Sequence, residues 1–197
     1  NIQGSDANEL VLERDGNHED NERARGLRVI TGSGAQDNTG LSLSVKEEGN
    51  TIIVEQVGRN GGEVYVTVPN SAIVEVTQST HHGGGMEVRD FSGDLDVSMM
   101  YHKVVLENVT GPTAVNSVYA SIEARLDRAP TNELHLHSTY SNVDLAIPGN
   151  TSADLRLSTS YGDMYTDFDI LISANSGGSE GRLNGTINGG GTVISLV

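Results

Sequence analysis

Apolar and polar residues alternate along short stretches of the chain, and the same alternation returns at a nearly constant interval. Four segments share one pattern: an apolar residue, any residue, an apolar residue, three residues, a tyrosine, two residues, and a second alternating apolar pair, with threonine in the apolar position at 113 and 166. They span residues 95–106, 113–124, 134–145 and 155–166. Their tyrosines, at intervals of 18, 21 and 21 residues, are Tyr101, Tyr119, Tyr140 and Tyr161. One repeat earlier, Thr80 stands in the tyrosine position and a glycine-rich extension follows it.

This pattern predicts the fold. Alternation with a period of two is typical of a strand with one buried face. The parity changes just after the tyrosine, at turn residues such as Ser141 and Asn142, so each repeat is expected to be a strand, a bend, a strand and a return turn. One repeat cannot bury its own apolar face, and a period near 20 residues therefore indicates stacking. The sequence predicts an all-β, single-domain, right-handed parallel β-helix (a solenoid) with rungs of about 18–21 residues.

One domain is expected over residues 1–197. It comprises a partly irregular N-terminal segment at 1–26 with an acidic loop at 14–22, early strands at 27–72, and regular rungs at 73–197 with a loop at 173–181. Strand-like runs before the repeats lie at 27–30, 41–45, 51–54 and 64–69. Pro69 and Pro148 are expected to mark strand exits, because proline cannot donate to a ladder. Ile194 and Leu196 match the two apolar positions before a tyrosine, and this final rung is expected to be truncated or disordered.

Composition excludes several classes of function. The chain has 27 acidic and 12 basic residues, for a formal charge of −15, so phosphate backbones and anionic lipid surfaces would repel it. We therefore expect no nucleic-acid partner. There is no cysteine, which excludes disulfides, thiol nucleophiles and thiolate metal sites. No run of eighteen apolar residues occurs, so no transmembrane segment is expected. The chain opens on Asn1 without methionine, and we expect an exported protein whose signal peptide has been removed.

Histidines are the first candidates for a site. His135 and His137 are two residues apart in a predicted strand, so they share its outward face while the leucines between them face the core. Stacking would place Ala114 and Arg156 beside His135, and Asn116 and Ser158 beside His137. Zinc needs three or four converging ligands, and none of these neighbours supplies one. We expect two surface histidines and no metal, and a loop tip at His81 and His82.

Two further sets of residues are candidates for ligand contact. The tyrosine column (Tyr101, Tyr119, Tyr140 and Tyr161) is expected to stack ring on ring at the bend, and the alternative is an aromatic strip that binds carbohydrate. Glu123 and Asp144 fall in one outward column, and Asp163, Asp167 and Asp169 cluster in the last repeat. Paired carboxylates could act as acid and base in a glycosidase or bind calcium, but a repeat generates like-charged neighbours by itself, and we favour a solvated acidic face. Neither a phosphate-binding loop nor a Gly-x-Ser-x-Gly elbow is present.

Several segments together resemble a family of bacterial exported proteins of unknown function, described as adhesins and common in gut Bacteroidetes. They are residues 26–29 (Gly-Leu-Arg-Val), residues 37–41 (Asp-Asn-Thr-Gly-Leu), the strand exit at Val68-Pro69, the tyrosine repeats, and residues 187–191 (Ile-Asn-Gly-Gly-Gly). The resemblance spans most of the chain from about Gly26 onward. It implies a β-helix fold and a cell-surface or periplasmic setting, and it supplies no catalytic residues.

These observations predict a non-enzymatic binding or structural module at the cell surface or in the periplasm, without a cofactor. The charge is compatible with three kinds of partner, a neutral glycan, a surface protein that is basic, or a divalent cation, and the sequence does not choose among them. The alternatives are a carbohydrate-active β-helix enzyme, which usually has longer rungs and side loops that wall a cleft, and a self-assembling or regulatory scaffold that acts through its end rungs. Turnover of a polysaccharide, or self-association in solution, would separate these three functions.

Overall fold

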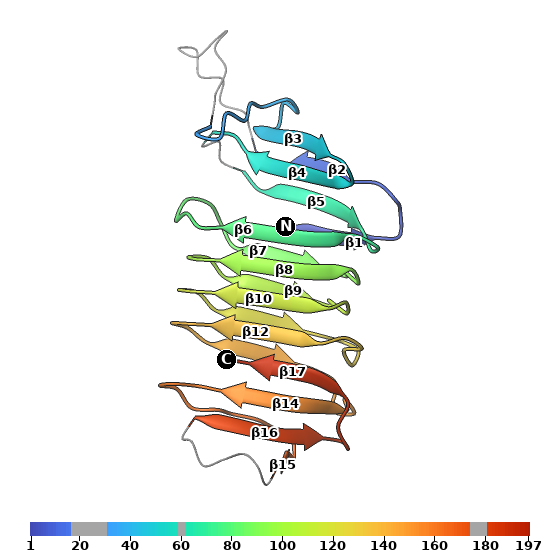
Figure 1. The fold of residues 1–197 in the computed structure, drawn as a ribbon, viewed down its shortest axis with the longest axis vertical. Helices are drawn as coiled ribbons and strands as arrows, with labels where there is room; N and C mark the ends of the chain where they lie inside the picture. The colour runs from blue at the N-terminus through green and yellow to red at the C-terminus, as the bar shows by residue number, and fades with distance from the viewer. Residues whose placement is uncertain (17–30, 59–61, 174–180) are drawn as a thin grey trace. The chain divides into compact units, whose positions relative to one another are not determined.

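The computed structural model of the protein describes residues 1–16, 31–58, 62–173 and 181–197. Within these ranges it consists of β-strands joined by turns and contains no helix (Figure 1), and so none that is long and apolar enough to cross a membrane. Residue contacts divide the chain into two compact units. The larger comprises residues Asn1–Val11 and Val66–Val197, and the smaller comprises residues Leu12–Tyr65. The single domain expected from the sequence stays a prediction.

The strands are short, and their bounds follow the chain in order. They are β1 (Ile2–Ser5), β2 (Val11–Arg14), β3 (Leu43–Glu48), β4 (Thr51–Gln56), β5 (Val64–Pro69), β6 (Ile73–Gln78), β7 (Met86–Arg89), β8 (Asp94–Met99), β9 (Val104–Glu107), β10 (Thr113–Ser117), β11 (Ile122–Arg125), β12 (Leu134–Ser138), β13 (Val143–Ala146), β14 (Ala153–Ser158), β15 (Leu171–Ile172), β16 (Arg182–Ile187) and β17 (Thr192–Leu196).

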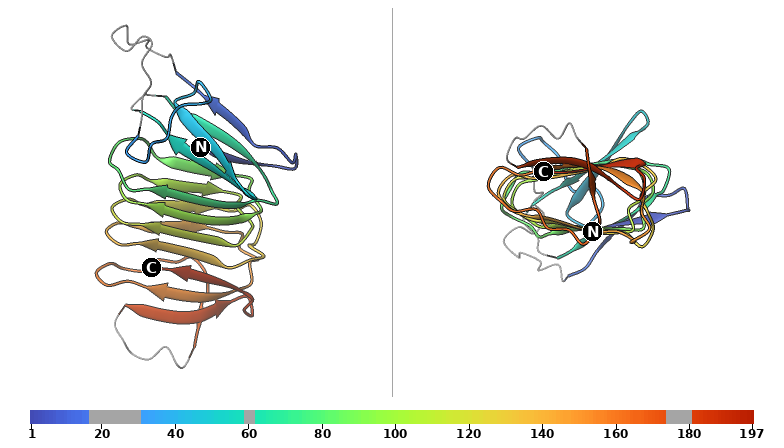
Figure 2. Two further views of the ribbon diagram at one scale, coloured as in Figure 1. Left: turned by 45° about the horizontal axis from the view of Figure 1, so that its top comes forward. Right: turned by 90° about the horizontal axis from the view of Figure 1, so that it is seen from below.

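In the larger unit, successive strands from β6 to β14 alternate between two sheets. The first sheet has the order β13-β11-β9-β7-β1-β5, and the second has the order β15-β16-β14-β17-β12-β10-β8-β6. The pairs that link neighbouring repeats are parallel: β6 with β8, β8 with β10, and β10 with β12 in the second sheet, and β7 with β9, β9 with β11, and β11 with β13 in the first. Seen from below, the two sheets face each other (Figure 2). The chain is therefore all-β with mostly parallel sheets.

The core of this unit lies between the two sheets and is filled from the alternating positions. Along β8 every second residue is buried, starting at Leu95, and β10 and β12 repeat this alternation. The register puts Val115 between Val97 and Leu136, so equivalent inward side chains stack on one another. Val104 and Ile122 meet in the same way in the first sheet. The sequence pattern therefore assigns the buried face of these strands correctly.

The N-terminal segment is more regular than the sequence predicts. β1 lies between β5 and β7, and Ile2 pairs with Val66 on one side and with Val88 on the other. Ile2 is buried in the same core. A four-residue strand with one buried apolar side chain shows no alternation of its own, and pairing with distant strands stabilises it. β2 then covers residue 14, which was expected to begin a loop, while residues 17–22 of that loop lie outside the described residues.

The fourth repeat does not stack on the third, which corrects the prediction for residues 155–166. β17 inserts between β12 and β14, so Ile194 pairs with both Leu134 and Leu155. β16 pairs antiparallel with the other edge of β14, and residues 163–170 form no strand. Ile194 and Leu196 carry the same apolar alternation as Leu155 and Leu157, so both segments fit beside β12. Of the two alternatives expected for the final rung, disorder is wrong, because β17 is a strand that pairs on both sides; truncation stays a prediction.

The smaller unit is built around a hairpin. β3 and β4 pair antiparallel, close to the expected strands at 41–45 and 51–54. β3 begins only at Leu43 because the preceding residues form a turn around Asp37, whose carboxylate accepts hydrogen bonds from the backbone N–H groups of Thr39, Gly40 and Ser42 at 2.9–3.0 Å. The expected strand at 27–30 and most of the expected loop at 173–181 lie outside the described residues.

Candidate functional site

The tyrosine column lies on the bends that follow β8, β10 and β12. Backbone hydrogen bonds fix the bends to one another: Tyr119 N donates to Met100 O at 3.0 Å, and Tyr140 N donates to Val118 O at 2.9 Å. Behind the bends, the hydroxyls of Ser117 and Ser138 both donate to Ala120 O. Because each bend is bonded to the next, equivalent tyrosines are held in line.

Three of the four tyrosines form a continuous stack. The ring centroids of Tyr101 and Tyr119 are 5.5 Å apart with the planes 13° from parallel, and those of Tyr119 and Tyr140 are 5.2 Å apart at 8°. Both spacings fall within the range of favourable aromatic pairs. The stack of tyrosines predicted from the sequence is therefore confirmed for Tyr101, Tyr119 and Tyr140.

The stack is also exposed, and the exposure rises along it. The exposed fractions of Tyr101, Tyr119 and Tyr140 are 42%, 55% and 70%. Since each inner ring face is covered by the neighbouring ring, the column presents ring edges to solvent along its length. A flat ligand can reach a ring face only at an end of the stack.

The two ends of the stack differ. At one end the ring of His81 meets Tyr101 edge-on, with the centroids 6.3 Å apart and the planes at 87°. At the other end no aromatic ring among the described residues lies on the outer face of Tyr140. His81 lies in the expected loop, but its contact with Tyr101 was missed by sequence reasoning; its place directly after Thr80, the tyrosine position of the preceding repeat, is the signal that could have revealed it.

Tyr161 does not join the stack, which corrects the expectation of a four-membered column. It follows β14, and β17 separates β14 from β12. Neighbouring strands lie about 4.8 Å apart, so this insertion places Tyr161 two strand spacings, or roughly 9.6 Å, from Tyr140. Its side chain is fully exposed.

Replacing Tyr119 by alanine removes both ring pairs of the stack. We expect the free energy of unfolding to fall by about 1–3 kcal/mol, because each aromatic pair contributes about 0.5–1.5 kcal/mol beyond its buried area. Urea unfolding followed by circular dichroism measures this loss. Tyr161→Ala is the matched control and should change the free energy of unfolding by less than about 0.5 kcal/mol. Equal losses in the two variants would show that the ring contacts contribute no stability.

The outward face of the first sheet carries ion pairs instead of a row of free carboxylates. Lys103 Nζ lies 2.6 Å from Glu123 Oε1, and Arg125 Nη2 lies 3.6 Å from Glu123 Oε2. One repeat away, Arg89 contacts Glu87 at 2.6 Å and Glu107 at 3.3 Å. The charges on this face thus alternate in sign along β7 and β11, and across the strands in the column of Arg89, Glu107 and Arg125, which stabilises that column.

Glu123 and Asp144 are direct neighbours in the register of β11 and β13, as the sequence predicts. The hydrogen bond from Lys103 lowers the pKa of the Glu123 carboxyl below its ordinary value, and the positive charges of Lys103 and Arg125 lower it further. A general acid needs a raised pKa so that it carries a proton near neutral pH. Glu123 is therefore suited to holding a cation or accepting a hydrogen bond, and poorly suited to donating a proton.

The remaining candidates do not converge on one point. His135 is half-buried and its Nε2 lies 3.1 Å from Glu133 Oε2, while His137 is exposed. The strand neighbours of His135 are Ala114 and Ser195, and His137 lies beside Asn116. The expected contacts with Arg156 and Ser158 are wrong, because β17 separates β14 from β12. Glu133 shares the parity of the two histidines, and this signal was overlooked. Within the described ranges no group of three or more His, Asp or Glu side chains is placed to hold a metal ion.

Comparison of the chain with family models, with curated protein sequences and with solved structures finds no match.

Proposed function

We propose that the chain is a non-enzymatic binding or structural module, built as a right-handed parallel β-helix and working at the cell surface or in the periplasm. The alternation of successive strands between two mostly parallel sheets supports the β-helix, and the connection between parallel strands favours the right hand. The resemblance to exported bacterial proteins described as adhesins supports the location.

The observation that carries the proposal is the contrast between a filled interior and an exposed aromatic column. Inward side chains of three successive repeats, such as Leu95, Val115 and Leu136, are at most 1% exposed, so the interior has no room for a substrate. The stacked tyrosines, in contrast, are 42–70% exposed. Ligands therefore bind on the outside, where the outer ring face of Tyr140 offers an apolar platform.

The charge of the chain restricts the ligand. At −15 the protein repels anionic polysaccharides, and repulsion grows as salt is removed because the Debye length rises from about 8 Å at 0.15 M to about 30 Å at 0.01 M. A neutral glycan can stack on Tyr140, and a basic surface protein can meet the acidic groups. The lowered pKa of Glu123 argues against this residue as a general acid, and in our proposal the module holds its ligand without converting it.

A glycan array that carries neutral, anionic and cationic sugars tests this proposal. We expect neutral glycans to bind the wild-type chain and the control Tyr161→Ala. In Tyr140→Ala they should lose about 1–3 kcal/mol of binding free energy, a range taken from nucleic-acid bases stacked on aromatic side chains. If Tyr140→Ala and Tyr161→Ala bind neutral glycans equally well, the tyrosine column does not take part in glycan binding. The wild-type chain should release no reducing sugar from a polysaccharide. Release that is lost in the Glu123→Gln/Asp144→Asn double variant would show that the chain is an enzyme and not a binding module.

A further inference from the structure

In the described part of the chain, one edge of the first sheet has no strand partner. β13 ends that sheet, and among the described residues only β11 pairs with it. The carbonyls of Asn142 and Ala146 accept hydrogen bonds from Ile122 N and Leu126 N of the β11 side, at 3.1 and 2.9 Å. In a parallel ladder alternate residues bond to opposite neighbours. The N–H and C=O groups of Val143 and Leu145 therefore point away from β11, toward the open edge.

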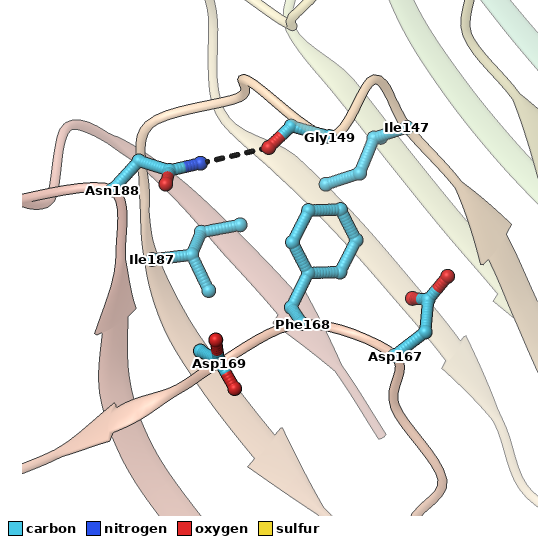
Figure 3. A pocket seen from close by; sticks show the side chains of 7 residues that line it. All are labelled: Ile147, Gly149, Asp167, Phe168, Asp169, Ile187 and Asn188. Atoms are coloured by element: carbon cyan, nitrogen blue, oxygen red, sulfur yellow. Dashed lines mark hydrogen bonds between the residues drawn. The ribbon is translucent and has the colours of Figure 1, made fainter.

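The two sheets are unequal at this level. In the second sheet β17 lies between β12 and β14, but in the described part of the first sheet no strand follows β13. Residues 163–170 form no strand and therefore do not extend the first sheet. A cavity of about 290 Å³ separates the end of β13 from them, lined by Ile147, Gly149, Asp167, Phe168, Asp169, Ile187 and Asn188. Figure 3 shows the ring of Phe168 between Ile147 and Ile187, with Asp167 and Asp169 on either side of it.

We call this region the β13 edge slot: the open edge of β13 (Val143–Ala146) together with that cavity. The inward side chains of β13 are apolar and incompletely covered. In the neighbouring strand β11, Ile122 and Ala124 are at most 1% exposed, whereas their partners Val143 and Leu145 are only half-buried. A further strand beside β13 would cover both side chains and satisfy the free edge groups, as in β-strand addition.

The charge around the slot is strongly acidic. Residues 140–172 contain five aspartates and a single basic residue, Arg156. Asp144 points outward from β13, and Asp167 and Asp169 rim the cavity; all three are exposed. In a strand beside β13, residues level with Val143 and Leu145 would face the core, and residues level with Asp144 would face outward next to that carboxylate.

We propose that the β13 edge slot binds an extended segment of a partner polypeptide in which basic residues alternate with apolar residues. The apolar side chains would cover Val143, Leu145 and Phe168, and the basic side chains would meet Asp144 and the rim aspartates. A second copy of this chain fits poorly, because both copies carry −15 and the slot itself is acidic. The inference deepens the proposed binding role and adds a site separate from the tyrosine column.

A dye-labelled ten-residue peptide of alternating lysine and valine is the probe, and fluorescence anisotropy measures its binding to the full chain. We expect this peptide to bind, more weakly as salt is added, and the matched peptide of alternating glutamate and valine not to bind. If the added strand is parallel, like its neighbours, its lysine amides face β13. Methylating those amides should then abolish binding, whereas methylating the valine amides should not. Equal binding of the lysine and glutamate peptides, or no effect of methylation on either edge, would overturn the proposal.

Two pairs of protein variants locate the site. Val143→Pro removes an N–H that points to the slot while leaving the bonds to β11 intact, and proline is tolerated on such an edge. Val143→Ala shortens the side chain but keeps the N–H, so Val143→Pro should bind the peptide about two- to tenfold more weakly than Val143→Ala, the worth of one hydrogen bond. Asp144→Asn should weaken binding by about two- to fivefold, the worth of one cross-strand charge pair. Asp96→Asn, which makes the same charge change on the second sheet, should not.

The outcomes separate this site from the tyrosine column. Tyr140→Ala tests glycan binding, and the Val143 variants should keep whatever glycan binding the wild-type chain has. If the peptide binds and glycans do not, the β13 edge slot is supported as a binding site and the tyrosine column is not. If glycans bind and the peptide does not, the proposed slot is wrong. Sedimentation measures self-association of the wild-type chain and of the two Val143 variants. Self-association that is lost in Val143→Pro but kept in Val143→Ala would show that a second copy of the chain occupies the slot, and would overturn the proposed basic partner.

Discussion

Replacing Leu136 by alanine is expected to lower the free energy of unfolding of the larger unit by about 2–5 kcal/mol, the usual loss for a buried leucine. Leu136 is 1% exposed, and its strand neighbours are Val115 and Leu196. The truncation therefore leaves a cavity that borders two other strands. In a stacked array each strand layer depends on its neighbours, so the loss is not confined to β12.

Urea unfolding followed by circular dichroism measures this effect. The control is Ser141→Ala in the bend of the same repeat, where the side chain is exposed and the change should stay within about 0.5 kcal/mol. Small and equal losses for the two variants would mean that the inward and outward faces of β12 are the reverse of those described.

Replacing Phe91 by alanine is expected to cost about 3–5 kcal/mol, because a fully buried aromatic ring leaves a large cavity. Phe91 is 0% exposed and belongs to the same core as the repeats. Its surroundings are tight: a side-chain carbon built at Gly93 would lie 2.5 Å from Phe91 Cζ. The segment around it is bonded to the next repeat, since Thr110 N donates to Phe91 O at 3.0 Å.

The chain has two phenylalanines, and the second provides a matched control. Phe168 packs against the core but is only half-buried, so Phe168→Ala should cost clearly less than Phe91→Ala in the same unfolding experiment. If the two variants lose equal stability, burial does not explain the contribution of Phe91.

The repeated alternation determined much of the larger unit without any structure. Period-two alternation is local information, and it assigns Leu95, Val115 and Leu136 to the core because successive side chains of a strand must point to opposite faces. The spacing of 18–21 residues then places equivalent positions beside one another, which brings Tyr101, Tyr119 and Tyr140 into a stack. Both inferences need only the period of the strand and the period of the repeat.

The pairing partners at the two ends of the unit could not be predicted in this way. Ile2 lies in a segment without alternation, and only its distant partners Val66 and Val88 make it part of the sheet. Near the other end, Leu155 and Ile194 sit in segments with the same apolar pattern, so either fits beside Leu134. A local pattern cannot choose between two equivalent strands.

The chemistry of the candidate sites was likewise divided between the two levels. The sequence by itself determined the acidic charge, the outward column of Glu123 and Asp144, and the line of tyrosines, because these follow from composition and parity. Only the tertiary structure decided that Lys103 and Arg125 neutralise Glu123, that β17 displaces Tyr161 from the stack, and that β13 keeps an open edge. These features depend on which strands become neighbours, and that choice is made by packing among segments far apart in the chain.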